Sequence, residues 1–235
     1  MQLQRCLLAC TTLATLLLCG CGQQLQTVFF EDFDNAPLNQ PPPATPQKGV
    51  EITLDDPDLA RVHSFGGQIN SRAVRYDQPT GLFQSIYFVA STPSANYDDG
   101  FRVIWRGKYG KVNDAGVSLS LMSGHFNTAW TVIFKGGKVK VFENNQEVEI
   151  GLLPLDHAHT FMCTALKSTG KYSLSIIGDD GTTLSKEGPI QMSAFWNSSP
   201  VSLRLYSLDG KPNPQSQGDS FIIDEPNIVA IKKGN

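Results

Sequence analysis

Basic side chains are concentrated in one stretch of this sequence. Five of the six arginines that follow residue 20 lie between positions 61 and 106, although the chain has a formal net charge of −3. A guanidinium group offers a planar fork of donors that matches carboxylate and phosphate groups. We therefore predict an anion-binding face for an acidic glycan or a lipopolysaccharide phosphate, formed by Arg75, Tyr97, Arg102, Arg106 and Lys108. The alternative is a solvated face whose charges pair with Asp77, Asp98, Asp99 and Asp114.

Catalytic groups are harder to find. A retaining glycosidase uses two carboxylates about 5 to 5.5 Å apart, and the nearest candidates are Glu147 and Glu149, which would share one strand face about 6 to 7 Å apart. They follow a turn at 144–145, which favours a solvated hairpin strand. His157 and His159 also share a strand face, but zinc needs at least a third protein ligand. The sequence leaves enzymatic activity open and favours a non-catalytic protein.

The first 20 residues are typical of a secretory signal. Arg5 precedes an apolar stretch from Cys6 to Leu18, which is too short to span a bilayer as a stable helix. One cysteine, Cys163, lies beyond position 21, so we expect a buried thiol and no disulfide in the folded part. We therefore assign residues 1–20 to a signal peptide.

The junction that follows resembles a bacterial lipobox. The residues are Leu18-Cys19-Gly20-Cys21, and the resemblance implies cleavage before Cys21 and acyl chains on that residue. Several acyl chains hold a protein stably at a membrane, so we expect an envelope lipoprotein. Gly22 in place of an aspartate favours the outer membrane, by resemblance to the sorting signals of enteric bacteria. Cys19 as the acceptor, or an ordinary secretory signal cleaved nearby, are the alternatives.

Composition excludes several classes of protein. The chain has 235 residues, of which 40% are hydrophobic and 17% are charged. This composition provides enough apolar side chains for a hydrophobic core. It excludes collagen, a coiled coil and a multi-span membrane protein. The negative net charge gives no support to nucleic-acid binding.

The apolar residues alternate with a period of two, which predicts half-buried strands. Turn residues such as the glycine pair at 136–137 separate the alternating segments and favour antiparallel hairpins. The predicted strands are 27–33, 50–54, 68–75, 82–90, 101–108, 117–122, 129–135, 138–143, 147–150, 159–166, 172–177, 201–205, 221–224 and 228–232. In two of them Trp105 and Trp130 fall on the predicted core face. So many strands require two packed sheets.

A proline-rich segment at 35–48 is predicted to be extended and polyproline-like. It could be read as an interdomain linker. However, too few residues precede it in the mature chain to form a domain, so we expect the strand at 27–33 to return to the main sheet. We therefore predict a lipidated tether at 21–26 and a single β-sandwich domain at 27–235.

Both ends of this domain resemble jelly-roll sandwiches. The opening is Phe29-Phe30-Glu31-Asp32-Phe33-Asp34 and the closing strand begins Phe221-Ile222-Ile223-Asp224. The segment 137–149 is similar to segments of concanavalin A-like lectin/glucanase domains. The resemblance implies an all-β, antiparallel two-sheet jelly-roll sandwich. It does not extend to the Glu-x-Asp-x-x-Glu motif of the laminarinase-like members, which this sequence lacks.

The resemblance also implies a structural calcium ion where the first and last strands meet. Calcium takes six to eight oxygen ligands, and the matching carboxylates are Glu31, Asp32, Asp34 and Asp224. The alternative is that these acids point outward on edge strands and discourage aggregation.

The sequence thus favours a membrane-anchored lipoprotein whose sandwich binds carbohydrate or another envelope ligand without catalysis. One alternative is a glycan-cleaving hydrolase of the same fold. The other is a structural or assembly lipoprotein that binds a protein partner.

Overall fold

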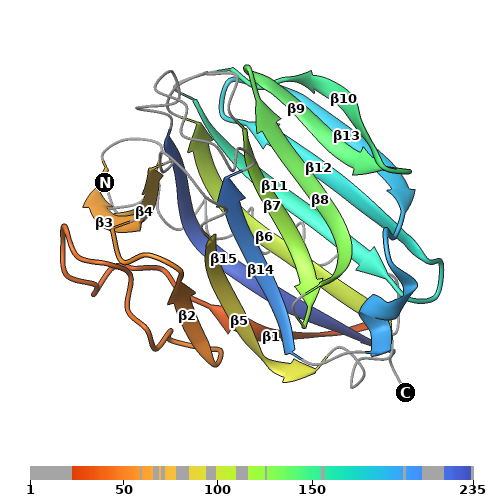
Figure 1. Cartoon of the computed structure of the whole chain (residues 1–235), viewed down its shortest axis with the longest axis horizontal. Coiled ribbons are helices and arrows are strands. Elements are labelled where there is room, and N and C mark those ends of the chain that lie inside the picture. The colour runs from red at the N-terminus through yellow and green to blue at the C-terminus, as the bar shows by residue number, and fades with distance from the viewer. Residues whose placement is uncertain are drawn as a thin grey trace.

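Strands make up nearly all of the regular structure. The computed structural model describes residues 23–58, 60–65, 69, 72–77, 85–93, 99–109, 116–124, 126–154, 157–197, 200–207 and 220–233. In these ranges the strands form two antiparallel sheets that stack face to face (Figure 1), and a short 3-10 helix, η2 (Ser193–Asn197), lies beside them. The predicted all-β two-sheet jelly-roll sandwich is confirmed.

The larger sheet has eight strands in the order β13-β12-β11-β6-β15-β4-β3, and β1 pairs with the second half of β15. Its members are β1 (Gln23–Phe30), β3 (Ala60–Ser64), β4 (Arg72–Asp77), β6 (Gly100–Tyr109), β11 (Ala158–Leu166), β12 (Lys171–Gly178), β13 (Thr183–Pro189) and β15 (Ser220–Lys233). The first and last strands of the domain therefore lie side by side.

The smaller sheet has seven strands in the order β10-β9-β8-β7-β14-β5-β2. Its members are β2 (Glu51–Leu54), β5 (Ser85–Pro93), β7 (Val117–Ser123), β8 (Asn127–Lys135), β9 (Lys138–Glu143), β10 (Gln146–Leu152) and β14 (Pro200–Ser207). In this sheet β14 lies between β7 and β5, so a strand from late in the sequence occupies the middle.

Stacked aromatic rings join the two sheets. Trp105 of β6 lies across the strand pair from Phe161 of β11, and their parallel rings have centroids 4.9 Å apart. Trp130 of β8, from the smaller sheet, stacks on Trp105 with centroids 6.2 Å apart. All three side chains are buried, as the alternation predicted for both tryptophans. Burial of large aromatic side chains dominates the energetics of such cores.

The last strand is longer than predicted. The sequence predicted two strands interrupted at Glu225-Pro226, but β15 is continuous and carries a bulge between Asp224 and Asn227. Glu225 has a φ of 48° there, and a bulge accommodates a proline that has no N–H to donate. The bulge separates the part of β15 that pairs with β4 from the part that pairs with β1.

Two strands escaped the sequence prediction, β3 and β13. They are the two edge strands of the larger sheet. An edge strand forms backbone hydrogen bonds with one neighbour and does not need an apolar pattern on both faces. In β13, residues 186–188 are charged residues and a glycine, so the sequence shows no apolar alternation there. β1 also begins earlier than predicted, at Gln23, so residues 23–26 of the predicted tether belong to the sheet.

The proline-rich segment lies against the sandwich. Asn39 N donates to Val62 O over 2.8 Å, and Val62 N donates to Gln40 O over 2.9 Å, so the segment runs along β3. Ile52 N donates to Ala44 O over 2.9 Å. These hydrogen bonds cover part of the exposed edge that β3 would otherwise present.

A partly buried carboxylate also connects the sheets at one edge. Tyr172 Oη of β12 donates to the Glu143 carboxylate of β9, and Lys186 Nζ of β13 lies 3.3 Å from the same carboxylate. Burial of the ring and the hydrogen bond to Glu143 raise the pKa of Tyr172. Gly188 faces this group, since a Cβ at that position would lie 2.0 Å from Glu143 Oε1.

We expect Gly188→Ala to destabilise the protein by about 1 to 3 kcal/mol, because the added methyl group overpacks the Glu143 contact. Urea unfolding of the full chain in detergent measures the change. The matched control is Gly136→Asn, since Gly136 has a φ of 59° that asparagine tolerates and a Cβ there would meet no atom within 4 Å. Equal unfolding midpoints for Gly188→Ala and the unmodified chain would contradict the prediction.

Candidate functional site

The predicted basic residues gather on the outer face of the larger sheet. Phe101, Val103 and Trp105 of β6 point into the core, so the residues between them point outward. In the ladder, Arg75 of β4 and Lys108 of β6 flank the same residue of β15. The residues that share this face are Arg75, Arg102, Arg106 and Lys108. The fifth predicted residue, Tyr97, lies outside the described residues.

Two of these arginines are bound to other side chains of the chain. The Arg106 guanidinium forms an ion pair with the Asp179 carboxylate at the end of β12. Arg102 Nε donates to Thr164 Oγ1 over 3.1 Å. Arg106 thus has a carboxylate partner, although Asp179 is not one of the four aspartates named in the alternative. Ligand binding by this face stays a prediction.

The four carboxylates expected to hold calcium do not form a site. The Glu31 carboxylate is buried and accepts the backbone N–H groups of Phe33 over 3.0 Å and Gln47 over 2.8 Å, one on each oxygen. Asp32 Oδ1 accepts the backbone N–H of Asp34 over 3.1 Å. These hydrogen bonds stabilise the turn after β1.

Asp224 lies on β15, next to the bulge that separates it from Asn227, the residue paired with Phe30 of β1. It pairs with Arg106 in the β15–β6 ladder and is fully buried. Among the described residues no group of three or more His, Cys, Asp or Glu side chains could hold a metal ion. The structure therefore does not confirm the expected four-carboxylate calcium site.

The candidate catalytic groups are placed as structural residues. Glu147 pairs with Lys140 at 2.7 Å and Glu149 pairs with Lys138 at 2.8 Å across the β9–β10 hairpin. The Cys163 thiol is completely buried, and burial raises its pKa well above the ordinary value. Both observations agree with the structural alternatives given for these residues.

His159 is buried at the start of β11, beside the turn that follows β12. A Cβ at Gly178 would lie 2.9 Å from His159 Cδ2, so the glycine makes room for the imidazole ring. Burial lowers the pKa of His159, and the carboxylates of Asp180 and Asp179 oppose this in part. Asp180 is itself held by Thr182, whose N–H and Oγ1–H each donate to it over 2.9 Å. The folded protein therefore favours neutral His159.

We expect the protein to lose stability as the pH falls below about 6.5, because His159 binds a proton more readily in the unfolded chain, where its pKa takes the ordinary value. His159→Gln should flatten the dependence of the free energy of unfolding on pH between 7 and 5, measured by urea titration. The matched control is His63→Gln on β3, where the side chain is partly exposed. A His159→Gln variant with an unchanged pH dependence would show the prediction to be wrong.

The outer face of the smaller sheet carries a second group of polar and aromatic residues. Arg204 lies at the middle of β14, opposite Tyr87 of β5 and two residues before Tyr206. Its guanidinium carbon lies 4.6 Å from the centre of the Tyr206 ring and 5.2 Å from that of Tyr87. Arg204 Nε donates to Ser85 Oγ over 2.8 Å. Both rings and the guanidinium group keep part of their surface exposed.

Hydroxyl groups extend this face across the sheet. Ser120 of β7 lies opposite Arg204, and its Oγ is 2.9 Å from Thr131 Oγ1 of β8. Thr131 Oγ1 donates in turn to Gln191 Oε1 over 3.3 Å. Ser118, opposite Tyr206, is buried, and its Oγ has no hydrogen-bond partner among the described residues. Tyr87, Arg204, Ser120 and Thr131 form one transverse row of the sheet, and Tyr206 lies in the next row. The hydroxyl residues are buried, so the partly exposed group on this face is Tyr87, Arg204 and Tyr206.

The sequence analysis missed Arg204 because it stands apart from the cluster of arginines. The signal that could have found it was the Ser-Leu-Arg-Leu-Tyr alternation at 202–206. Leu203 and Leu205 are buried in the core, so Ser202, Arg204 and Tyr206 must share the outer face.

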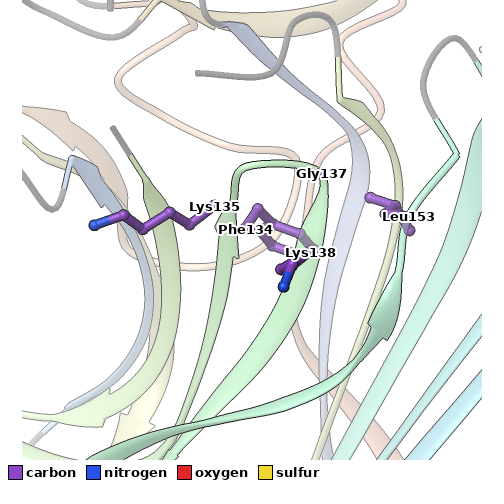
Figure 2. A pocket seen from close by; sticks show the side chains of 5 residues that line it. All are labelled: Phe134, Lys135, Gly137, Lys138 and Leu153. Atoms are coloured by element: carbon purple, nitrogen blue, oxygen red, sulfur yellow. The ribbon is translucent and has the colours of Figure 1, made fainter. Parts of the chain in front are cut away.

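A recess at the β8–β9 hairpin is not a ligand site. Figure 2 shows its lining residues, which are Phe134, Lys135, Gly137, Lys138 and Leu153. The recess is too tight to admit a water molecule. It reflects packing of the hairpin over Leu153, whose N–H donates to Gly137 O over 2.9 Å.

Comparison with known proteins identifies the architecture. No family model and no curated protein sequence matches the chain. The basic winged bean lectin with Tn-antigen superposes with a TM-score of 0.60 at 11% identity, over 88% of this chain and 98% of the lectin. The fold is that of the legume lectins. The predicted concanavalin A-like sandwich is thereby confirmed.

Two further structures have the same architecture. Peanut lectin with a nine-residue peptide gives a TM-score of 0.57 at 8% identity, over 88% of this chain and 98% of the lectin. The CBM2 module of the evolved Dit of Lactobacillus casei BL23 phage J-1 gives 0.53 at 12% identity, over 91% of this chain and 99% of the module. At these identities the likeness shows the fold alone.

The described residues include no helix with the length and apolar character needed to cross a membrane.

Proposed function

We propose that this protein is a non-catalytic carbohydrate-binding sandwich. The observation that carries the proposal is the group of Tyr87, Arg204 and Tyr206, which lie together and partly exposed on the outer face of the smaller sheet. Tyrosine rings offer apolar faces to the C–H groups of a sugar, while their hydroxyls and the guanidinium group bind its oxygens. The lectin-like fold agrees with this role. The salt bridges of Glu147 and Glu149 speak against a hydrolase built on that pair.

The proposal places the protein in the bacterial envelope. The lipobox-like sequence that ends at Cys21 supports a lipid anchor there, and Gly22 supports the outer membrane as its destination. The basic face of Arg75, Arg102 and Arg106 would then suit acidic envelope glycans or lipopolysaccharide. Calcium has no role in the proposal, because Tyr87, Arg204 and Tyr206 offer no carboxylate to a metal ion.

We expect the full chain in detergent to bind a subset of envelope polysaccharides on a glycan array, equally well in calcium and in chelator. Tyr87→Ala and Tyr206→Ala should each weaken binding about tenfold, because each removes one aromatic surface worth about 1 to 2 kcal/mol. Titration calorimetry with the selected glycan measures the loss. The matched control is Phe126→Ala, which removes an aromatic ring that is 82% exposed at the β7–β8 turn.

Three outcomes would contradict parts of this proposal. If Arg102→Ala/Arg106→Ala abolishes binding and the tyrosine variants do not, the ligand binds the larger sheet. Loss of binding in chelator would restore a role for a cation. If the unmodified chain binds no glycan, carbohydrate binding itself is wrong and the protein-binding alternative gains support.

We expect Cys21→Ser to abolish lipid attachment and to release the protein from membranes. Metabolic labelling with an alkyne-bearing palmitate and fractionation of bacteria that express the chain measure both effects. Cys163→Ser is the matched control, because that thiol is buried and should leave labelling unchanged. Labelling that persists in Cys21→Ser and disappears in Cys19→Ser would move the anchor to Cys19.

A further inference from the structure

Arg204 differs from other arginines of the chain in what surrounds its guanidinium group. Arg61 pairs with Asp58, and Arg106 pairs with Asp179. None of the ion pairs among the described residues includes Arg204, whose neighbours are two tyrosine rings and a serine hydroxyl. A partly buried positive charge is costly to hold without an anion close by. The group is therefore ready to gain from a negatively charged ligand.

The guanidinium group is also held in one orientation. Nε donates to Ser85 Oγ over 2.8 Å, and Tyr206 and Tyr87 lie against it at 4.6 and 5.2 Å. The two terminal amino groups donate no hydrogen bond to any described residue. A donor that is fixed before binding loses little conformational entropy when a ligand arrives.

The charge of the site selects the kind of anion. The other cations of this face lie farther along the sheet. Lys140, whose register position lies two strands beyond Ser118, is neutralised by Glu147 at 2.7 Å, and Lys135 lies at the far end of β8. Arg204 is therefore the one cation in contact with the two tyrosine rings among the described residues. One planar guanidinium matches one planar carboxylate of charge −1 in shape and charge, whereas a phosphate group carries close to two negative charges at neutral pH.

We propose that Arg204 is a specificity residue for acidic sugars. Its terminal amino groups bind the carboxylate of a uronic acid unit, and Tyr87 and Tyr206 flank the sugar ring. This inference rests on the proposed function, because it assigns a ligand class to the same sheet face. It also separates this face from the basic face of the larger sheet, where Arg106 already has the Asp179 carboxylate as its partner.

The test compares each of a set of uronic acid oligosaccharides with the same oligosaccharide after its carboxyl groups have been reduced to alcohols. We expect the full chain in detergent to bind the carboxylate form about tenfold to a hundredfold more tightly, the range for a hydrogen-bonded charge. Arg204→Gln should lose this preference and bind both forms with the weaker affinity. Arg204→Lys keeps the charge without the planar fork and should retain part of the preference.

Arg61→Gln is the matched control, since it removes an arginine from the other sheet and should leave the preference intact. Thermal unfolding checks that each variant is folded. If Arg204→Gln does not fold, the comparison is made with Arg204→Lys. Equal affinity of the unmodified chain for both sugar forms overturns the inference and leaves the proposed function standing. So does tighter binding to a phosphorylated sugar than to the carboxylate. Binding to neither form, nor to any array glycan, overturns both.

Discussion

The contact between Trp105, Phe161 and Trp130 determines which side chains the molecule presents to solvent. Trp105 stacks on Phe161 within its own sheet and on Trp130 across the interface, and all three are buried. Since neighbouring residues of a strand point to opposite faces, burial of Trp105 commits Arg106 to the outer face. A slip of one residue in β6 would expose the tryptophan and bury the arginine, and both changes are costly.

The same constraint operates in β14. Leu203 and Leu205 enter the core from the smaller sheet, so Arg204 and Tyr206 are left outside with Tyr87 opposite. Two arginines on opposite outer faces thus arise from the same packing. They differ in their partners, because Arg106 meets Asp179 whereas Arg204 lies among tyrosine rings. Packing of the core determines the face on which Arg106 and Arg204 lie. The residues of neighbouring strands determine whether the charge of each is neutralised.

This division explains how much could be predicted from the sequence. Alternation within one strand placed Trp105, Trp130 and the basic residues of β6 on the correct faces. The contacts of Arg204 depend on which strands lie beside β14, and Tyr87 is more than one hundred positions away in the chain. The partners of the four acids could not be predicted for a related reason. The backbone N–H that binds Glu31 Oε2 belongs to Gln47, sixteen residues further along the chain.

The early start of β1 has a consequence for how the domain would stand on a membrane. Gln23 is already paired with Lys233 at the end of β15, and Cys21 precedes it by two residues. If Cys21 bears the lipid, the tether from Cys21 to the first residue of β1 can extend to about 7 Å. The sandwich would then be held at one corner, where Lys232 pairs with Gln24. With so short a tether the domain would stay close to the bilayer, and a ligand would have to come to the membrane surface.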